Sequence, residues 1–435
     1  MPQLDPQQQR EFAVTVVGRL RAEGHTAYWA GGCVRDQLLG LMPKDYDVAT
    51  SAPPEEVRRI FTHNRTLAIG AAFGVITVLG PWRAGQIEVA TFREDLGYTD
   101  GRHPDTVQFS TAELDAHRRD FTINGLFYDP VDDRIIDYVL GQRDLREGLV
   151  RAIGNPRYRF HEDRLRMLRA VRLAAQFGFQ LEVETLHAIR EMAELLTAVS
   201  AERIGSEMRR MLEHPTRARA VELLRETKLL AVVLPELEAL VADPPAGDGD
   251  WRETLLVLRT LPEGDLPLAL AAVLHRINRP EAHSDRKHAN IAEQVADRLR
   301  LPRKDGARAA WILNHLTVIT QARQIPWPRL QRVLFFDGTE QLLTLHAAVQ
   351  GEDDPNLQYC RAKLQLPPEQ LNPAPLIGGD DLIAHGLKPG KIFQKLLDLV
   401  RDAQLEGKLA TKKEALAMVD AIMQERSSRR TSGTE

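Results

Sequence analysis

The chain has 435 residues, too many for one hydrophobic core, and this length is typical of two to four domains. Its 43% hydrophobic and 27% charged residues are ordinary for a globular protein, and a net charge of −4 does not by itself indicate nucleic-acid binding. The densest apolar stretch, residues 266–274, is too short to span a membrane. The two cysteines, Cys33 and Cys360, lie far apart, so we expect no disulfide, no structural zinc and a cytoplasmic location.

The first 140 residues mix helix and strand signals. Apolar residues recur at helical spacing over residues 12–20, and two prolines precede a second predicted helix at 55–61. Short strands are predicted at residues 25–30, 45–48, 74–79, 86–92 and 134–139. Glycines and a proline among charged residues predict a mobile loop at 95–105.

From residue 141 onward the periodicity is almost entirely helical. Helices are predicted at residues 162–177, 183–195, 201–212, 218–227, 339–349 and 412–423, and a surface loop at 243–250. Thr411 and Glu414 form the capping-box pattern at the start of the last helix. The sequence therefore predicts an α+β protein, with an α/β head at 1–140 followed by an all-helical neck (141–215), body (216–363) and tail (364–435).

A candidate catalytic site begins with Asp45 and Asp47. Side chains two apart in an extended segment point to the same side, and two such carboxylates repel unless a cation neutralises them. Magnesium takes carboxylate oxygens together with substrate phosphates, so the pair indicates a magnesium site. Glu88, on a predicted core strand, is the candidate third acid. A surface turn for the aspartates, and a solvent-facing position for Glu88, are the alternatives.

A glycine pair, Gly31 and Gly32, ends the strand before these aspartates and opens a short helix that carries Arg35. Backbone without Cβ atoms lets peptide N–H groups approach a triphosphate, and Arg35 offers a phosphate partner. The alternative is a tight turn that needs glycine only for steric reasons.

Together these residues resemble the class II tRNA nucleotidyltransferases and bacterial poly(A) polymerases, over about residues 25–215. Residues 31–36 read Gly-Gly-Cys-Val-Arg-Asp, and residues 44–47 read Lys-Asp-Tyr-Asp. Three further segments follow in that family's order: Arg-Arg-Asp-Phe-Thr-Ile-Asn-Gly at 118–125, Glu-Asp-Arg-Leu-Arg at 162–166 and Ala-Glu-Arg-Ile at 201–204. One such match is weak evidence, whereas four in order are specific.

The resemblance implies a head like that of DNA polymerase β and a two-metal, magnesium-dependent transfer that adds CCA to the 3′ end of tRNA from CTP and ATP. It assigns catalysis to Asp45, Asp47 and Glu88, with the two aspartates as metal ligands. It assigns nucleotide binding to Gly31, Gly32, Arg35, Arg118, Arg119, Asp120, Asn124, Asp163, Arg166, Arg169 and Arg172. No protein partner and no membrane are implied.

Nucleotide choice is assigned by the same resemblance to Asp163 and Arg166. Three residues apart, they are predicted on one helix face, where a carboxylate and a guanidinium meet the edge of cytosine or adenine. Arg169 and Arg172 continue this spacing toward triphosphate or RNA, within a basic stretch of eight arginines and three acids at 146–172. An ordinary surface ion pair is the alternative.

Two further features separate the related activities. The loop at 95–105 resembles one that assists the change from C to A addition, so it favours CCA or A addition over C addition alone. A phosphohydrolase-like module at 266–315 has His275-Arg276 where a metal-binding His-Asp pair is needed, so we expect no such activity. A poly(A) polymerase, an enzyme adding only the final A, and a catalytically silent RNA-binding relative remain the alternatives.

Overall fold

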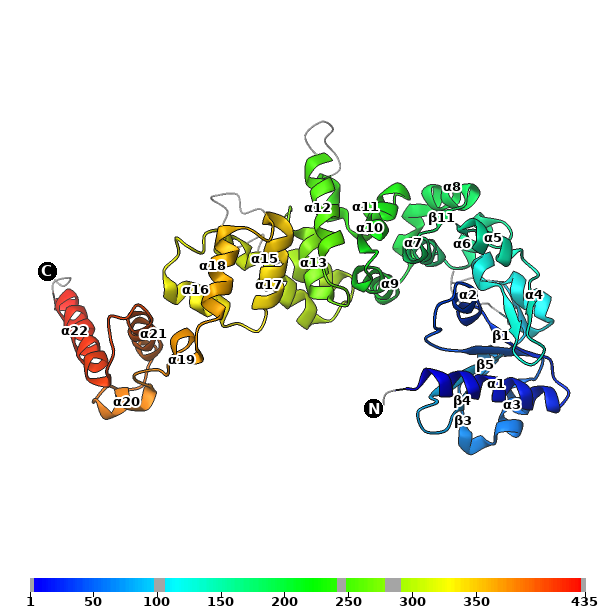
Figure 1. Ribbon diagram of the computed structural model, residues 1–435, viewed down its shortest axis with the longest axis horizontal. Helices are drawn as coiled ribbons and strands as arrows, with labels where there is room; N and C mark the ends of the chain where they lie inside the picture. Colours follow the sequence, from blue (N-terminus) through cyan, green and yellow to red (C-terminus); the bar gives the residue numbers. More distant parts are fainter. Residues whose placement is uncertain (1–3, 98–105, 241–247, 278–290, 432–435) are drawn as a thin grey trace. The chain divides into compact units, whose positions relative to one another are not determined.

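The computed structural model describes residues 4–97, 106–240, 248–277 and 291–431 (Figure 1). The chain divides into two compact units, one formed by Met1–Trp251 with Asp297–Leu301, the other by Arg252–Ala296 with Pro302–Glu435. No helix in these described ranges is both long and apolar enough to cross a membrane.

A seven-stranded mixed sheet forms the centre of the head, in the order β3-β4-β5-β2-β1-β8-β9. The strands are β1 (Ala27–Ala30), β2 (Asp47–Thr50), β3 (Thr66–Gly70), β4 (Val75–Leu79), β5 (Gln86–Thr91), β8 (Phe127–Asp129) and β9 (Arg134–Ile136). Only β2 and β5 pair in parallel, and the other neighbours in this sheet are antiparallel. Because β2 and β5 run parallel, their N-terminal ends lie at the same end of the sheet.

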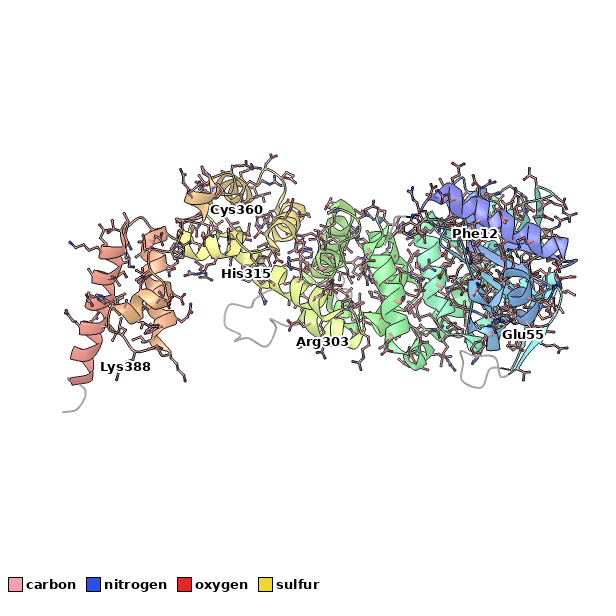
Figure 2. All side chains as sticks on the ribbon, turned by 90° about the horizontal axis from the view of Figure 1, so that it is seen from below. Phe12, Glu55, Arg303, His315, Cys360 and Lys388 are labelled. Carbon is pink, nitrogen blue, oxygen red and sulfur yellow. The ribbon has the colours of Figure 1, made fainter. Side chains whose placement is uncertain are left out.

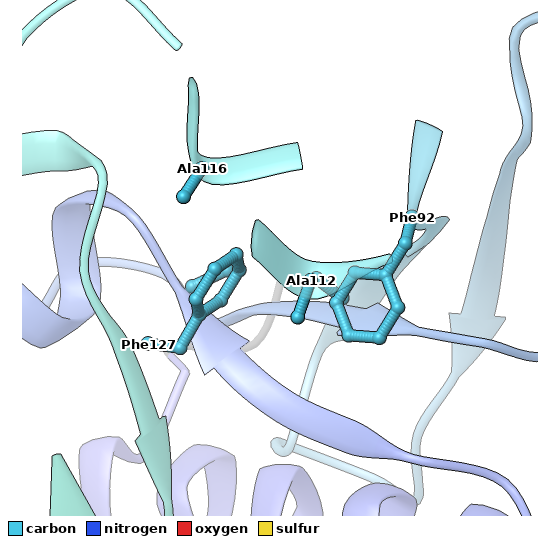
Figure 3. Packing of buried hydrophobic residues seen from close by; sticks show 6 residues of the cluster. Phe92, Ala112, Ala116 and Phe127 are labelled. Atoms are coloured by element: carbon cyan, nitrogen blue, oxygen red, sulfur yellow. The ribbon is translucent and has the colours of Figure 1, made fainter. Parts of the chain in front are cut away.

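The two faces of the sheet are covered by different helices. Helices α1 (Pro6–Ala22) and α3 (Pro54–Phe61) contact one face, where Trp29 and Val48 are fully buried. On the other face, Ala49, Phe92 and Phe127 pack with α4 (Ala112–His117) in a small apolar cluster (Figure 3). Because strand side chains alternate, Asp47 shares the α4 face with Ala49.

Four strands in this region were not predicted. β3 and β8 belong to the main sheet, and β6 (Arg93–Leu96) pairs with β7 (Thr106–Phe109) in a separate antiparallel hairpin. The prediction of a loop was therefore wrong for residues 95 and 96, which lie in β6. Residues 98–105 of the predicted loop lie outside the described residues.

Helices dominate the rest of the first unit, as predicted. They are α2 (Gly32–Leu38) in the head, and α5 (Gly141–Glu147), α6 (Pro156–Glu162), α7 (Arg166–Phe177), α8 (Val183–Met192), α9 (Ala201–Glu213), α10 (Arg217–Glu226) and α11 (Leu230–Val233). A two-residue parallel ladder joins β10 (Leu149–Val150) to β11 (Gln180–Leu181) beside them.

The single helix predicted at 162–177 was wrong. α6 ends at Glu162, Asp163 is extended with φ −148°, and α7 begins at Arg166. The Asp163 carboxylate accepts a hydrogen bond from the Leu165 backbone N–H at 3.0 Å. A short side-chain acceptor of this kind competes with the helical hydrogen bonds of the main chain, and this explains the break.

The remaining helices are α12 (Asp248–Thr260), α13 (Leu266–Leu274), α14 (Ile291–Arg298), α15 (Arg303–Thr320), α16 (Trp327–Leu334), α17 (Thr339–Gln350), α18 (Pro355–Leu364), α19 (Pro368–Leu371), α20 (Gly379–Ala384), α21 (Ile392–Leu405) and α22 (Lys412–Thr431). The loop predicted at 243–250 gives way to α12 at Asp248. The predicted capping box is confirmed, because the Glu414 carboxylate accepts from Thr411 N–H at 3.0 Å and the Thr411 hydroxyl accepts from Glu414 N–H at 3.3 Å.

Candidate active site

Two of the predicted acids stand side by side on neighbouring strands. Asp47, the first residue of β2, is in register with Glu88 of the parallel strand β5. Both are exposed, whereas the next residue of each strand, Val48 and Val89, is fully buried on the opposite face. Asp45, also exposed, precedes Asp47 by two residues. The structure therefore places all three carboxylates at the start of the parallel strand pair.

The electrostatics of Asp47 show that the three acids interact. Removal from water by surrounding protein atoms and repulsion from Asp45 and Glu88 raise the pKa of Asp47 to about 6, against a smaller opposing effect of Arg119. A cation bound beside these carboxylates would reverse the shift, so the charge arrangement fits a metal ion. Within the described ranges no group of three or more histidine, cysteine or acidic side chains is positioned to hold one ion.

In the turn before α2, the first residue, Gly31, must lack a side chain for steric reasons. Gly31 has φ +73° and ψ −126°, a conformation that L side chains rarely adopt. A Cβ atom there would lie 3.0 Å from Nη1 of Arg119, whereas one on Gly32 would meet only Nη2 of Arg35 at 3.6 Å. Gly31 therefore keeps the backbone close to an arginine guanidinium.

Arg35 is turned into the protein, away from the exposed acids. Only 8% exposed, it donates from Nη1 to Oδ1 of Asn124 at 2.6 Å and from Nε and Nη2 to Oδ1 of Asp36 at 2.9 and 2.6 Å. Its guanidinium lies 4.6 Å from the centre of the Phe177 ring. In this arrangement Arg35 links α2 to the end of α7, and a phosphate would have to compete with these partners.

The side chains of Arg118 and Arg119 both form ion pairs with Asp115. Asp115 was not predicted as a site residue. Arg118 lies 2.7 Å and Arg119 2.9 Å from the two oxygens of this carboxylate. Burial alone would raise the pKa of Asp115, but Arg119 and Arg118 outweigh burial and lower it. The signal was in the sequence, because an acid three and four residues before two arginines on a helix is placed to pair with both.

Asp120 and Asn124 connect the head to α7. Asp120, 9% exposed, accepts from Nε and Nη2 of Arg169 at 2.8 and 2.6 Å and from Nδ2 of Asn124 at 3.0 Å. Burial opposes ionisation, yet Arg169 and Asn124 hold the pKa of Asp120 well below its usual range. The carboxylate is therefore charged, and it orients the arginine that was expected to meet a triphosphate.

The expected base-reading pair does not share a helix face. Asp163 lies in the link between α6 and α7, where its Oδ2 accepts from Nη2 of Arg203 at 2.7 Å. Arg166, the first residue of α7, donates to Oε2 of Glu162 at 2.5 Å and to the carbonyl of Arg118 at 3.4 Å. Neighbours from α6 and α9 thus orient the two side chains separately. Arg203 belongs to the matched segment 201–204 but was not predicted as a site residue.

The basic stretch at 146–172 is largely neutralised by Glu162 within it and by acids from other segments. Arg172 donates to Glu207 of α9 at 2.6 Å, and burial lowers the pKa of this arginine despite that partner. Six of the eight arginines form ion pairs: Arg151, Arg157, Arg159, Arg166, Arg169 and Arg172. The stretch is therefore an ordered network around α7 rather than a freely solvated positive surface.

In the phosphohydrolase-like module at 266–315, where no metal site is expected, the candidate residues have structural partners. His275 is buried, with Nδ1 2.6 Å from the carbonyl oxygen of Ala272, and Arg276 pairs with Glu253. His315 stacks on Trp311 with ring centres 4.5 Å apart. His288 lies outside the described residues. The absence of phosphohydrolase activity stays a prediction.

The mixed sheet and the acids at the start of its parallel strands define the head as a nucleotidyltransferase domain. A model of the poly A polymerase head domain matches residues 27–151, and one described as a probable RNA and SrmB-binding site of polymerase A matches 178–240. The chain is 33% identical to a CCA-adding enzyme of Bacillus licheniformis, covering 93% of this chain and 96% of the relative. It is likewise 33% identical to one from Lacticaseibacillus paracasei, with 95% and 97% covered.

Solved structures show the same relationship. The crystal structure of the Bacillus stearothermophilus CCA-adding enzyme in complex with CTP is 29% identical, with a TM-score of 0.71 over 98% of this chain and 99% of that one. A Thermotoga maritima CCA-adding enzyme complexed with tRNA shares the fold, with a TM-score of 0.64 at 20% identity over 97% of both chains. The chain belongs to the family of CCA-adding enzymes, nucleotidyltransferases that generally depend on a metal ion. The predicted family and fold class are thereby confirmed.

Proposed function

We propose that this protein adds CCA to the 3′ end of tRNA from CTP and ATP and releases pyrophosphate. The observation that carries the proposal is the acid arrangement at the start of β2 and β5, in a chain that is related over almost its full length to CCA-adding enzymes. The relatives named for CTP and tRNA complexes support the same substrates for this chain.

Asp45 and Asp47 are the proposed metal ligands, with Glu88 beside them. The repulsion that raises the pKa of Asp47 is the charge that a divalent cation would neutralise. Bound magnesium would favour ionisation of the attacking 3′ hydroxyl and neutralise charge on the departing pyrophosphate. Carboxylate oxygens at this position suit a hard cation such as magnesium.

The arginine network is proposed to bind the incoming nucleotide. Arg118 and Arg119 keep a fixed orientation through Asp115, so little side-chain entropy is lost when a phosphate is bound. Gly31 keeps the backbone beside Arg119, with its own N–H donated to the Leu126 carbonyl, and Gly32 is the first residue of α2. For Arg35, Asp120, Asn124, Arg169 and Arg172 we propose a supporting role in the substrate-free arrangement, since their polar atoms already have protein partners.

Nucleotide selection is proposed for Asp163 and Arg166. A carboxylate acceptor and a guanidinium donor match the hydrogen-bonding edges of cytosine and adenine. Arg203 and Glu162 fix the direction of each group, so the pair acts as a protein template for the base.

In the tail, the exposed Lys388, Lys391 and Lys395 are proposed to contact the tRNA body, together with Lys408, which pairs with Glu406.

Purified protein, incubated with tRNA that lacks CCA and with CTP and ATP separately and together, tests this function. We expect two C residues from CTP alone and a single further A when both nucleotides are present. Long A tails without C incorporation would identify a poly(A) polymerase, and incorporation of A only onto tRNA ending in CC would identify an A-adding enzyme. Binding of tRNA without any incorporation would identify a silent relative.

A further inference from the structure

The head has a cavity on the sheet face opposite the acids. Its volume is about 570 Å³, and Phe12, Arg19, Phe61, Arg65 and Val78 are among its lining residues. Val78 of β4 pairs with Ile87, whereas the neighbouring Thr77 pairs with Glu88. Because side chains alternate along a strand, Val78 and Glu88 point to opposite faces. The cavity is therefore separate from the proposed catalytic site.

Two guanidinium groups give this cavity its charge. Arg19 donates to the carbonyl of Ile60 and lies 4.6 Å from the Phe61 ring centre, but it forms no ion pair with any described residue. Arg65 is exposed, and its side chain has neither a hydrogen bond nor an ion pair among the residues described. Glu11 is the one acid in the lining, and Gln7 donates to it at 2.9 Å. With two arginines and one glutamate, the lining carries a net charge of +1 and unused guanidinium donors.

Aromatic rings and a strained residue form the rest of the cavity. Phe61 is 3% exposed, and Phe12, labelled on α1 in Figure 2, packs so closely on the turn after β4 that a Cβ on Gly80 would lie 2.8 Å from its ring. Thr62 lines the cavity with φ +68° and ψ 145°, a conformation rare for a β-branched residue. Such strain persists where the surrounding structure enforces it, and it concentrates at ligand sites.

We propose that this cavity binds a free mononucleotide, at a site distinct from the one that supplies the transferred nucleotide. Guanidinium groups suit a phosphate, and the Phe12 ring and nearby apolar side chains suit a flat base. A volume of about 570 Å³ falls within the range of small-molecule sites. The inference goes beyond CCA addition, because no residue of the proposed catalytic site lines the cavity.

The test uses AMP as the probe on the full-length protein. 8-Azido-AMP is photo-cross-linked in EDTA and the labelled peptides are mapped, and AMP affinity is measured by calorimetry. We expect a label on the segments around Phe12 or residues 61–65, and about tenfold weaker AMP binding at this site in Arg65→Ala, from the loss of a charged hydrogen bond. Arg134→Ala, which removes an exposed arginine from the distant edge strand β9, is the matched control and should bind AMP normally.

Three results would overturn the proposal: labels confined to segments around residues 31–47 and 118–166, equal AMP affinity in Arg65→Ala and the control, or displacement of AMP from this cavity by saturating tRNA. The last result would mean that the RNA, not a free nucleotide, occupies the site. CCA incorporation is measured on the same preparations. A wild-type protein that incorporates no nucleotide but is labelled at Phe12 would contradict the proposed function and leave this inference standing.

Discussion

At the scale of single residues, Asp47 is the position where the fold disfavours the ionised carboxylate that metal binding needs. Its backbone begins a strand whose following residues are buried, yet its carboxylate faces Asp45 and Glu88. Without a cation, the folded chain brings these negative charges together at a cost in free energy. A metal ion would remove this cost and at the same time create the reactive site.

The first prediction concerns the stability of the metal-free protein. The pKa of Asp47 is about 6 in the folded state, above its ordinary 3.8, so between these values the folded protein retains a proton that the unfolded chain has lost. Stability therefore falls as pH rises from about 4 to about 6 and stays reduced above that range. At pH 7.5 in EDTA, Asp47→Asn should unfold at higher denaturant concentration than wild type, by about 1 kcal/mol after allowance for solvent screening at this exposed side chain.

Denaturant titrations at pH 4 and pH 7.5 measure this difference. Glu55→Gln changes an exposed acid on α3, labelled in Figure 2, and α3 covers the sheet face opposite the acids. This variant is the control and should leave stability unchanged at both pH values. If Asp47→Asn matched wild type at both pH values, the three carboxylates would not interact as described.

The second prediction concerns nucleotide choice. Arg203 holds the carboxylate of Asp163 at 2.7 Å, so Arg203→Ala should leave Asp163 free to rotate and reduce the preference for the correct base. Loss of one orienting charged hydrogen bond should lower selectivity by about tenfold while triphosphate affinity changes little. Single-nucleotide incorporation with each of the four triphosphates measures this. Glu202→Ala, an exposed neighbour on the same helix, is the control; equal selectivity in the two variants would contradict the orienting role.

At the scale of elements, the glycine turn before α2 gives a matched pair of substitutions. Gly31→Ala forces a side chain into a positive-φ conformation with Cβ 3.0 Å from Nη1 of Arg119, at a cost of about 1–3 kcal/mol. Gly32→Ala meets Arg35 at an ordinary 3.6 Å. We expect nucleotide incorporation to fall sharply in the first variant and little in the second, and thermal unfolding to shift in the same order. Similar losses in both variants would mean that any side chain in this turn is harmful.

The capping box of α22 gives a prediction for the tail. The Glu414 carboxylate accepts backbone N–H groups of Ala410 and Thr411, and these bonds lower the pKa of Glu414. Glu414→Ala should lower the amide protection factors in the first turn of α22 several-fold, and acidification through the lowered pKa should lower them in wild type as well. Lys413→Ala, at the preceding position, is the control. Unchanged exchange in Glu414→Ala would show that the cap does not stabilise this helix start.

The sequence predicted several of the helices and the central strands because their apolar periodicity is strong. It did not reveal the break at Asp163, since buried residues such as Phe160 and Leu168 continue the helical spacing on both sides of it. It also missed β3, where Leu67 and Ile69 are exposed at the sheet edge, because an edge strand need not alternate. The aspartate pair was singled out from its spacing, whereas some partners of the arginines come from distant segments, as with Glu207 for Arg172.

At the scale of the whole molecule, the proposed catalytic and selection residues all lie in the first unit. Residues 1–251 contain the sheet, the acids, α7 and α9, so chemistry and base choice share one compact body. The second unit is helical and has its own apolar core in the tail, where Leu382, Leu396 and Val419 pack together. Relatives match along both units, so the family relationship covers nearly the whole chain.

The most direct test of the account measures incorporation of CMP into tRNA lacking CCA by wild type, Asp45→Ala and Asp47→Ala, with magnesium varied and tRNA affinity measured on the same samples. We predict a rate loss of about a thousandfold or more in each variant, corresponding to several kcal/mol of lost charge stabilisation. Transfer RNA affinity should remain near that of wild type. Turnover in either variant close to the wild-type rate would contradict the claim that these two carboxylates hold the catalytic metal.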